Sequence, residues 1–116
     1  MKFLLLLYGD EVAEAALSPA ERQAIVDRHQ EFSRMLLDRG ALIGGEPLAP
    51  SAGAALVREG GHVSDGPFAE TKEQLGGYYL VECQDRDEAI ELARKVPISP
   101  GLAVEVRALA DMQGGG

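Results

Sequence analysis

The feature that most constrains this fold is an uninterrupted apolar run near the start of the chain, at residues 3–8. Successive side chains of a strand point to opposite faces of a sheet, so an unbroken run gives apolar side chains on both faces. Gly9 and Asp10 end the run. We therefore expect a strand in the middle of a sheet, with material packed against both of its faces.

A long helix is predicted next, because the signals for its start and its stop are both present. Ser18 can cap the first turn, Pro19 suits the first helical position, and Glu21 completes a capping box. The helix should run to about Asp38 and stop at Arg39-Gly40. Its expected inner stripe follows a spacing of four, three and four residues: Ile25, His29, Phe32 and Leu36.

The remaining pattern predicts one domain over residues 1–112 and a disordered glycine tail over 113–116. The expected elements are a strand at 41–45, a hairpin at 54–58 and 62–64, a strand at 77–83, a helix from Asp85 to about Val96, and a strand at 103–109. This order favours the α+β class, as a ferredoxin-like split βαβ sandwich with an extra hairpin. Both helices would then cover the same face of the sheet.

The opposite face of such a sheet would be an apolar patch in need of a partner. A second copy of the chain is the economical partner, which predicts a homodimer with its two sheets face to face. The last strand alternates, with Val104 and Val106 on one side and Glu105 and Arg107 on the other. If the charged pair faces the dimer interior, the interface encloses some polar space.

Composition narrows the choice of partners. The net charge of −8 disfavours contact with nucleic acid and with anionic membrane surfaces. No run approaches the roughly 20 apolar residues that a membrane span needs, so we expect a cytoplasmic protein. Cys83 is the only cysteine, which excludes a disulfide within the chain.

The segment Asp65-Gly66-Pro67-Phe68-Ala69-Glu70-Thr71-Lys72-Glu73-Gln74, called the motif loop below, is where function is expected. Asp-Gly-Pro is turn chemistry, and Phe68 places an aromatic ring among ionisable side chains in a loop. Each feature also has a structural interpretation. Asp65 can cap the turn with its own side chain, Phe68 can anchor the loop, and the charged residues can form a solvated run.

The motif loop, the strand ending in Tyr8-Gly9-Asp10 and the following Gly76-Gly77-Tyr78-Tyr79 resemble the YCII-related proteins, specifically their DGPF-domain branch. The resemblance covers residues 1–112. It implies a dimeric α+β barrel. It also implies a link to extracytoplasmic-function sigma factors, beside which such proteins are often encoded.

YCII-type proteins carry an active-site histidine and aspartate, and the resemblance implies His29 for the histidine. In the shorter YCII branch the aspartate follows the second helix, but here residues 96–100 contain no acid. Asp65 or Asp10 would have to take its place. The related chemistry is cofactor-independent proton transfer on a small organic molecule, as in isomerases and lyases.

Three interpretations of the candidate residues remain open. In the first, His29 and Asp65 are catalytic, and Asp10, Phe68, Lys72 and Tyr79 contact a ligand. In the second, the protein is a non-catalytic small-molecule-binding or regulatory module, and His29 is a core histidine with a hydrogen-bond partner. A third possibility is a structural dimer that the motif loop stabilises. The spacing of the two histidines predicts no metal site, and no cofactor is implied.

Overall fold

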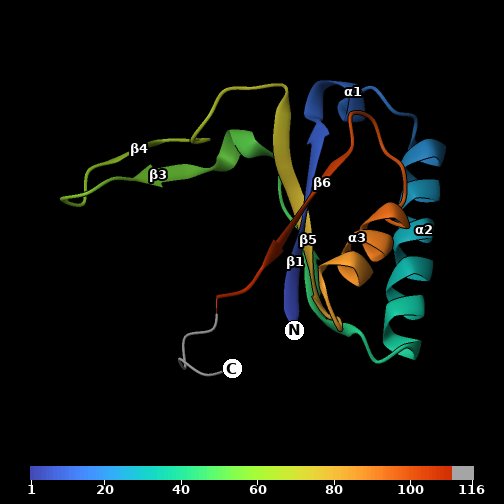
Figure 1. The fold of residues 1–116 in the computed structure, drawn as a ribbon. Coiled ribbons are helices and arrows are strands. Elements are labelled where there is room, and N and C mark those ends of the chain that lie inside the picture. The colour runs from blue at the N-terminus through green and yellow to red at the C-terminus, as the bar shows by residue number, and fades with distance from the viewer. Residues whose placement is uncertain (111–116) are drawn as a thin grey trace.

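A computed structural model describes residues 1–110 of the chain, so the predicted tail at 113–116 lies outside the described residues. The elements, in chain order, are β1 (Lys2–Asp10), α1 (Glu11–Ala15), α2 (Pro19–Asp38), β2 (Leu42–Pro47), η1 (Ser51–Gly53), β3 (Ala55–Val57), β4 (Val63–Asp65), β5 (Glu73–Glu82), α3 (Arg86–Arg94) and β6 (Ala103–Ala108). They form a four-stranded antiparallel sheet, helices packed on it and a separate two-stranded hairpin (Figure 1).

The strand predicted from the N-terminal apolar run is central, as expected. The order of the sheet is β2-β5-β1-β6, and β1 is antiparallel to both of its neighbours. Leu5 lies opposite Tyr79 on β5 and opposite Val106 on β6. A bulge between Leu7 and Tyr8 shifts the register near the end of β1.

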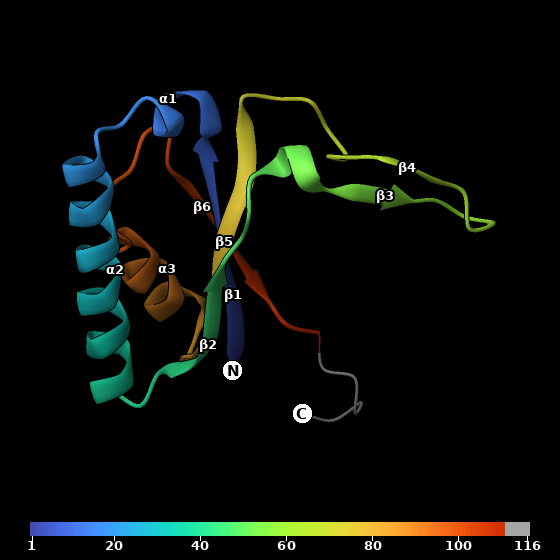
Figure 2. The ribbon, with the colours of Figure 1, turned by 180° about the vertical axis from the view of Figure 1, so that it is seen from behind.

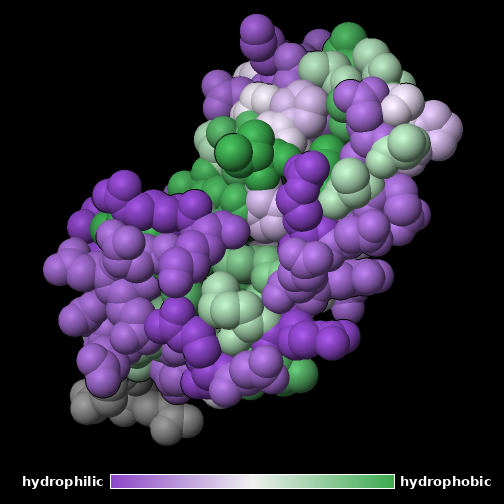
Figure 3. Space-filling view, turned by 90° about the vertical axis from the view of Figure 1, so that its right-hand side faces the viewer, coloured by the Kyte–Doolittle hydropathy of each residue, from purple (hydrophilic) through white to green (hydrophobic). Residues whose placement is uncertain are grey.

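The α-helices lie on one side of the sheet, and the core fills the space between them and the sheet (Figures 1 and 2). Phe3 and Leu5 of β1 and Leu36 of α2 are almost completely buried there. The capping box of α2 is present as predicted, since Ser18 and Glu21 each bond the other's backbone amide. The outer surface of this side is mostly polar, with a band of hydrophobic residues running through it (Figure 3).

The opposite face of the sheet, called the open face below, is covered by no α-helix of the described chain. Leu4 and Leu6 point to it and are half-buried, and Leu80 and Tyr78 lie opposite them on β5. Glu105 lies opposite Leu6 and so faces the same way. The open face is thus an apolar surface with a charged side, which agrees with the alternation predicted for β6.

The hairpin β3–β4, called the arm below, projects away from the sheet on the side opposite the helices (Figures 1 and 2). Gly60 and Gly61 form its turn with φ of 87° and 81°, the left-handed region that glycine adopts without strain. The arm forms its own two-stranded sheet. Its position explains a radius of gyration of 15.8 Å, compared with about 13 Å for a compact domain of this length.

Several element boundaries differ from the sequence-based prediction. The strand expected from residue 77 begins at Glu73. Beyond a bulge at Gly76, residues 73–75 stay paired with the end of β1. The helix expected to reach Val96 ends at Arg94. The short α1 was not predicted, since five residues are too few to show an apolar period. In residues 1–110 no helix is long and apolar enough to cross a membrane.

Candidate functional site

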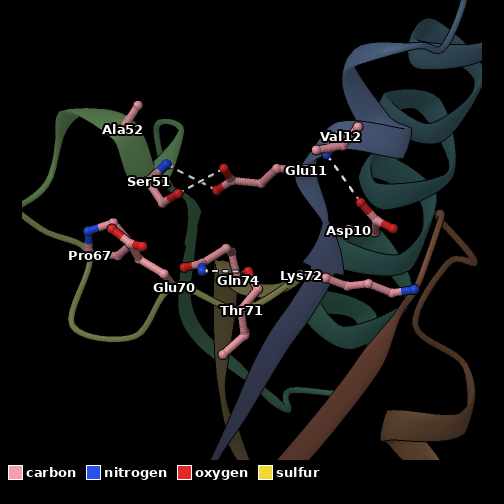
Figure 4. Close-up of a pocket in the computed structure, with 10 residues that line it drawn as sticks. All are labelled: Asp10, Glu11, Val12, Ser51, Ala52, Pro67, Glu70, Thr71, Lys72 and Gln74. Atoms are coloured by element: carbon pink, nitrogen blue, oxygen red, sulfur yellow. Dashed lines mark hydrogen bonds between the residues drawn. The ribbon is translucent and has the colours of Figure 1, made fainter.

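A pocket of about 440 Å³ opens at the end of the sheet where α1, η1 and the motif loop meet (Figure 4). Its walls come from segments far apart in the sequence, and they carry both acidic and basic side chains. The residues that line it are Asp10, Glu11, Val12, Ser51, Ala52, Pro67, Glu70, Thr71, Lys72 and Gln74. Two of the predicted ligand-contacting residues, Asp10 and Lys72, are therefore brought together here.

Asp10 ends β1 and caps α1. Its Oδ1 accepts hydrogen bonds from the amides of Val12 and Ala13, each at 3.1 Å. Its own amide donates to the carbonyl of Pro100 at 3.0 Å. Both side-chain bonds use Oδ1, so Oδ2 has no hydrogen bond within the described part of the chain. Asp10 is thus held in place by one oxygen while the other stays available.

Glu11 ties the end of β1 to the segment that precedes the arm. Its Oε1 accepts from the amide of Ser51 at 2.9 Å, and its Oε2 accepts from the Ser51 hydroxyl at 2.8 Å. Bonds to an ionised carboxylate are stronger than neutral ones, and two of them define an orientation. Sequence analysis missed this pair, because the two residues are 40 positions apart and neither belongs to a motif.

Burial raises the pKa of Glu14, and the charges of Glu11 and Asp10 raise it further. The carboxyl of Glu14 lies against Gly9, where a Cβ would come within 2.3 Å of its Oε1. A side chain at position 9 would therefore displace the Glu14 carboxyl from this place. The end of the sheet beside the pocket is an acidic region.

The motif loop is held by its own side chains. Thr71 Oγ1 donates to the carbonyl of Glu73 at 2.7 Å, and Gln74 Nε2 donates to the carbonyls of Ala69 at 2.9 Å and Thr71 at 2.8 Å. The Gly66–Pro67 peptide bond is cis. These bonds shape the lower wall of the pocket. Sequence analysis did not select Gln74 as a site residue.

Lys72 supplies the cation of the pocket. In Figure 4 its side chain extends on the Asp10 side of the pocket, away from Glu70. Its ammonium forms no ion pair within the part of the chain that the structure describes. The pocket therefore offers an unpaired ammonium and an unused carboxylate oxygen, which together can bind a small molecule that carries both an acidic and a donor group.

Phe68 and Asp65 lie outside this pocket. Phe68 is 76% exposed, and the guanidinium of Arg58 lies 5.7 Å from its ring centroid. Asp65 is exposed on β4, opposite Ala55 of β3. Because the arm projects from the side of the sheet opposite to α2, a single chain does not place Asp65 beside His29 (Figure 1).

His29 lies on α2, and its hydrogen-bond partner is Tyr79 of β5. Its Nδ1 is 2.7 Å from the Tyr79 hydroxyl, and the two rings are nearly parallel at 12° with centroids 5.9 Å apart. Phe32 packs edge-on against Tyr79 with centroids 5.0 Å apart. Gly45 permits this placement, because a Cβ there would come within 2.9 Å of the Tyr79 ring. Neither His29 nor Tyr79 lines the pocket of Figure 4.

Burial disfavours charge on both members of this pair. It lowers the pKa of His29, and it raises the pKa of Tyr79, which a bond with Ser33 partly offsets. Moving the proton from Tyr79 to His29 would create two charges in a half-buried place, so the pair is neutral near pH 7. Among residues 1–110 no group of three His, Cys, Asp or Glu side chains is arranged to hold a metal ion.

Comparison with known proteins finds two similarities. Residues 1–113 match the model of the YCII-related domain. A protein of Rhizobium meliloti (strain 1021), named Uncharacterized protein R00369, is 37% identical over 115 residues, which covers 95% of this chain and 93% of that protein.

Proposed function

The chain belongs to the YCII-related domain family, and we propose that it is a homodimer that binds a small organic molecule in the pocket between Asp10 and Lys72. The observation that carries the proposal is the pair of unused charges that line one cavity of about 440 Å³. Ligand sites commonly measure about 300–1,000 Å³ and fix their ligands with a few polar groups.

The charges indicate the class of ligand. A carboxylate of the ligand would pair with the Lys72 ammonium, and an amine or hydroxyl would donate to Asp10 Oδ2. Small amino acids and hydroxy acids carry both kinds of group. The acidic surroundings of Glu11 and Glu14 disfavour a ligand with several negative charges and no donor.

The homodimer is proposed from the open face. Leu4, Leu6, Tyr78 and Leu80 form an apolar surface on a sheet whose other face is already covered by helices. Two such faces in contact would form a dimeric α+β barrel. The polar groups between the sheets would be Glu105, which accepts from the Tyr8 hydroxyl at 3.1 Å, and its ion-pair partner Arg107.

Binding can be tested by thermal unfolding in the presence of a panel of amino acids and hydroxy acids. A ligand at about 100 times its Kd adds about 2.7 kcal/mol to stability, which shifts the Tm by several degrees. We expect Lys72→Met and Asp10→Asn to abolish the shift. Asparagine caps a helix about as well as aspartate, so Asp10→Asn removes charge without removing the cap.

Lys95→Met is the matched control, because Lys95 is an exposed lysine at the end of α3 and does not line the pocket. A ligand that stabilises the wild type and Lys72→Met equally would place binding elsewhere. If no member of the panel shifts the Tm of the wild type, the proposed ligand class is wrong.

Acid–base catalysis is the second candidate, and the short bond between His29 and Tyr79 favours it. A neutral His29 whose Nδ1 accepts from Tyr79 would carry its proton on Nε2 and offer it to a substrate. The chemistry would need no cofactor. If His29 is the acid–base group, His29→Gln should abolish turnover of the ligand but leave binding of the ligand intact. Unchanged turnover would exclude a catalytic role for His29.

A further inference from the structure

The arm has little of its surface buried against the rest of the described chain. Neither of its strands contains a buried residue, and the two cross-strand partners Val57 and Val63 are 64% and 62% exposed. Phe68, at its base, is 76% exposed. An isolated two-stranded hairpin is at best marginally stable in water, because few contacts offset about 1–2 kcal/mol of backbone entropy per residue.

Local interactions shape the arm but do not cover it. The amide of Gly66 donates to the carbonyl of Ala54 at 2.7 Å, and that of Arg58 donates to the carbonyl of His62 at 2.9 Å. Arg58 also lies over the ring of Phe68. These contacts close the hairpin on itself and leave the valine pair in solvent, so another surface is needed to bury it.

The arm and the open face lie on the same side of the molecule (Figures 1 and 2). A partner that covers the open face therefore meets the arm as well. A two-fold contact presents the same two surfaces from both sides, so one self-complementary arrangement would satisfy both copies. Both surfaces carry charges of each sign, since Arg107 is paired with Glu105 and Arg58 is next to Glu59, so like surfaces do not simply repel.

The available area also points to the arm. Strands of six to ten residues, at about 3.3 Å per residue and about 4.8 Å between strands, give the open face a plan area of roughly 400–600 Å². A specific, stable interface buries about 800 Å² on each partner. The arm enlarges the surface that the open face offers to a partner. Each side of the arm, about 20 Å long and about 10 Å wide, adds roughly 200 Å².

We infer that the arm packs against a second copy of this chain, beside the contact between the two open faces. The Val57–Val63 pair would supply the apolar contact. This inference rests on the proposed homodimer but adds the surface that holds it. Because the arm leads into the motif loop, dimer formation would also hold the pocket wall that Pro67 and Glu70 provide.

The test measures dimer dissociation by sedimentation equilibrium for two matched double variants. Val57→Lys with Val63→Glu replaces the exposed valine pair by opposite charges, which preserve cross-strand pairing and net charge. Val26→Lys with Leu37→Glu makes the same exchange at two exposed residues of α2, 47% and 64% exposed. We expect the dimer Kd to rise at least tenfold for the arm variant and to change less than twofold for the helix variant.

Hydrogen exchange of the wild type gives a second measurement that needs no substitution. The amides of Arg58 and Gly66 should exchange more slowly as the protein concentration passes the dimer Kd. A dimer whose Kd is the same in both double variants, and whose arm amides exchange at one rate at every concentration, would overturn the role of the arm and leave the homodimer intact. A wild type that remains a single chain at high concentration would overturn both, whereas ligand binding in the pocket could still be present.

Discussion

The two faces of the sheet show how the same strand can meet two different environments. On the helical face Leu5 is fully buried, and the tyrosine of that face, Tyr79, shares a neutral hydrogen bond with His29. On the open face Leu6 is half-buried, and Tyr8 donates to Glu105, which is ion-paired with Arg107. An ion pair is tolerated where water reaches it, and a buried site favours neutral partners.

The difference shows that the open face keeps its charged and polar groups paired with one another within a single chain. Burial, the bond to Glu105 and the nearby negative charge together raise the pKa of Tyr8, so its hydroxyl remains a donor. The bond to Arg107 and the bond from Tyr8 lower the pKa of Glu105. Within a single chain, Tyr8 therefore keeps its hydroxyl proton and Glu105 is ionised.

The largest expected effect is the difference in unfolding free energy between Leu5→Ala, on the helical face, and Leu6→Ala, on the open face. Leu5→Ala should lower the free energy of unfolding by about 2–5 kcal/mol, because it leaves a cavity in the core. Leu6→Ala should cost much less at low protein concentration and more as the dimer forms. Urea unfolding at two protein concentrations measures both. A cost for Leu6→Ala that does not depend on concentration would mean that the open face is not an interface.

A smaller effect is expected from Arg107→Ala. In a single chain its ion pair with Glu105 is exposed, so unfolding of the monomer should not change measurably. In the dimer the same substitution would leave Glu105 unpaired between two sheets, and the Kd should rise about tenfold or more. Glu105→Gln with Arg107→Ala should restore part of the affinity. Sedimentation equilibrium measures all three proteins, and equal affinities would place the pair outside the interface.

The smallest expected effect is a pH dependence of the free energy of unfolding, and it comes from His29 on the helical face. Burial lowers the pKa of His29 below its ordinary value of 6.5, so the unfolded chain takes up this proton first as pH falls. The contribution of His29 is complete above pH 6.5 and is lost as pH falls from there toward its lowered pKa. Urea unfolding between about pH 7.5 and 5.5 should show a slope that His29→Asn reduces. A slope that His29→Asn leaves unchanged would mean that His29 does not carry it.

The elements with local signals were predictable from the sequence. The capping box at Ser18 placed the start of α2, and the Gly60-Gly61 turn placed the arm, because each depends on neighbours within a few residues. The central position of β1 followed from its apolar run. The start of β5 at Glu73 was not predictable, since it depends on pairing with the end of β1 beyond a bulge at Gly76.

The candidate site was predictable only in part. Asp10 and Lys72 were selected from the sequence, and the structure places both in one pocket. Glu11 and Ser51 were missed, because their bonds join residues 40 positions apart. The roles of Asp65 and Phe68 remain predictions, and their exposed positions on and beside the arm make them candidates for contact with a second copy.

The sequence by itself determined the family, the order of the elements and the inward direction of His29, because these depend on local pattern. Only the tertiary structure decided that Tyr79 is the partner of His29, 50 positions away, and that Asp65 lies on the other side of the sheet. It also decided that the arm projects from the sheet on the side opposite the α-helices. The physical reason is that strand register and helix packing bring distant side chains together, and no short segment encodes either of them.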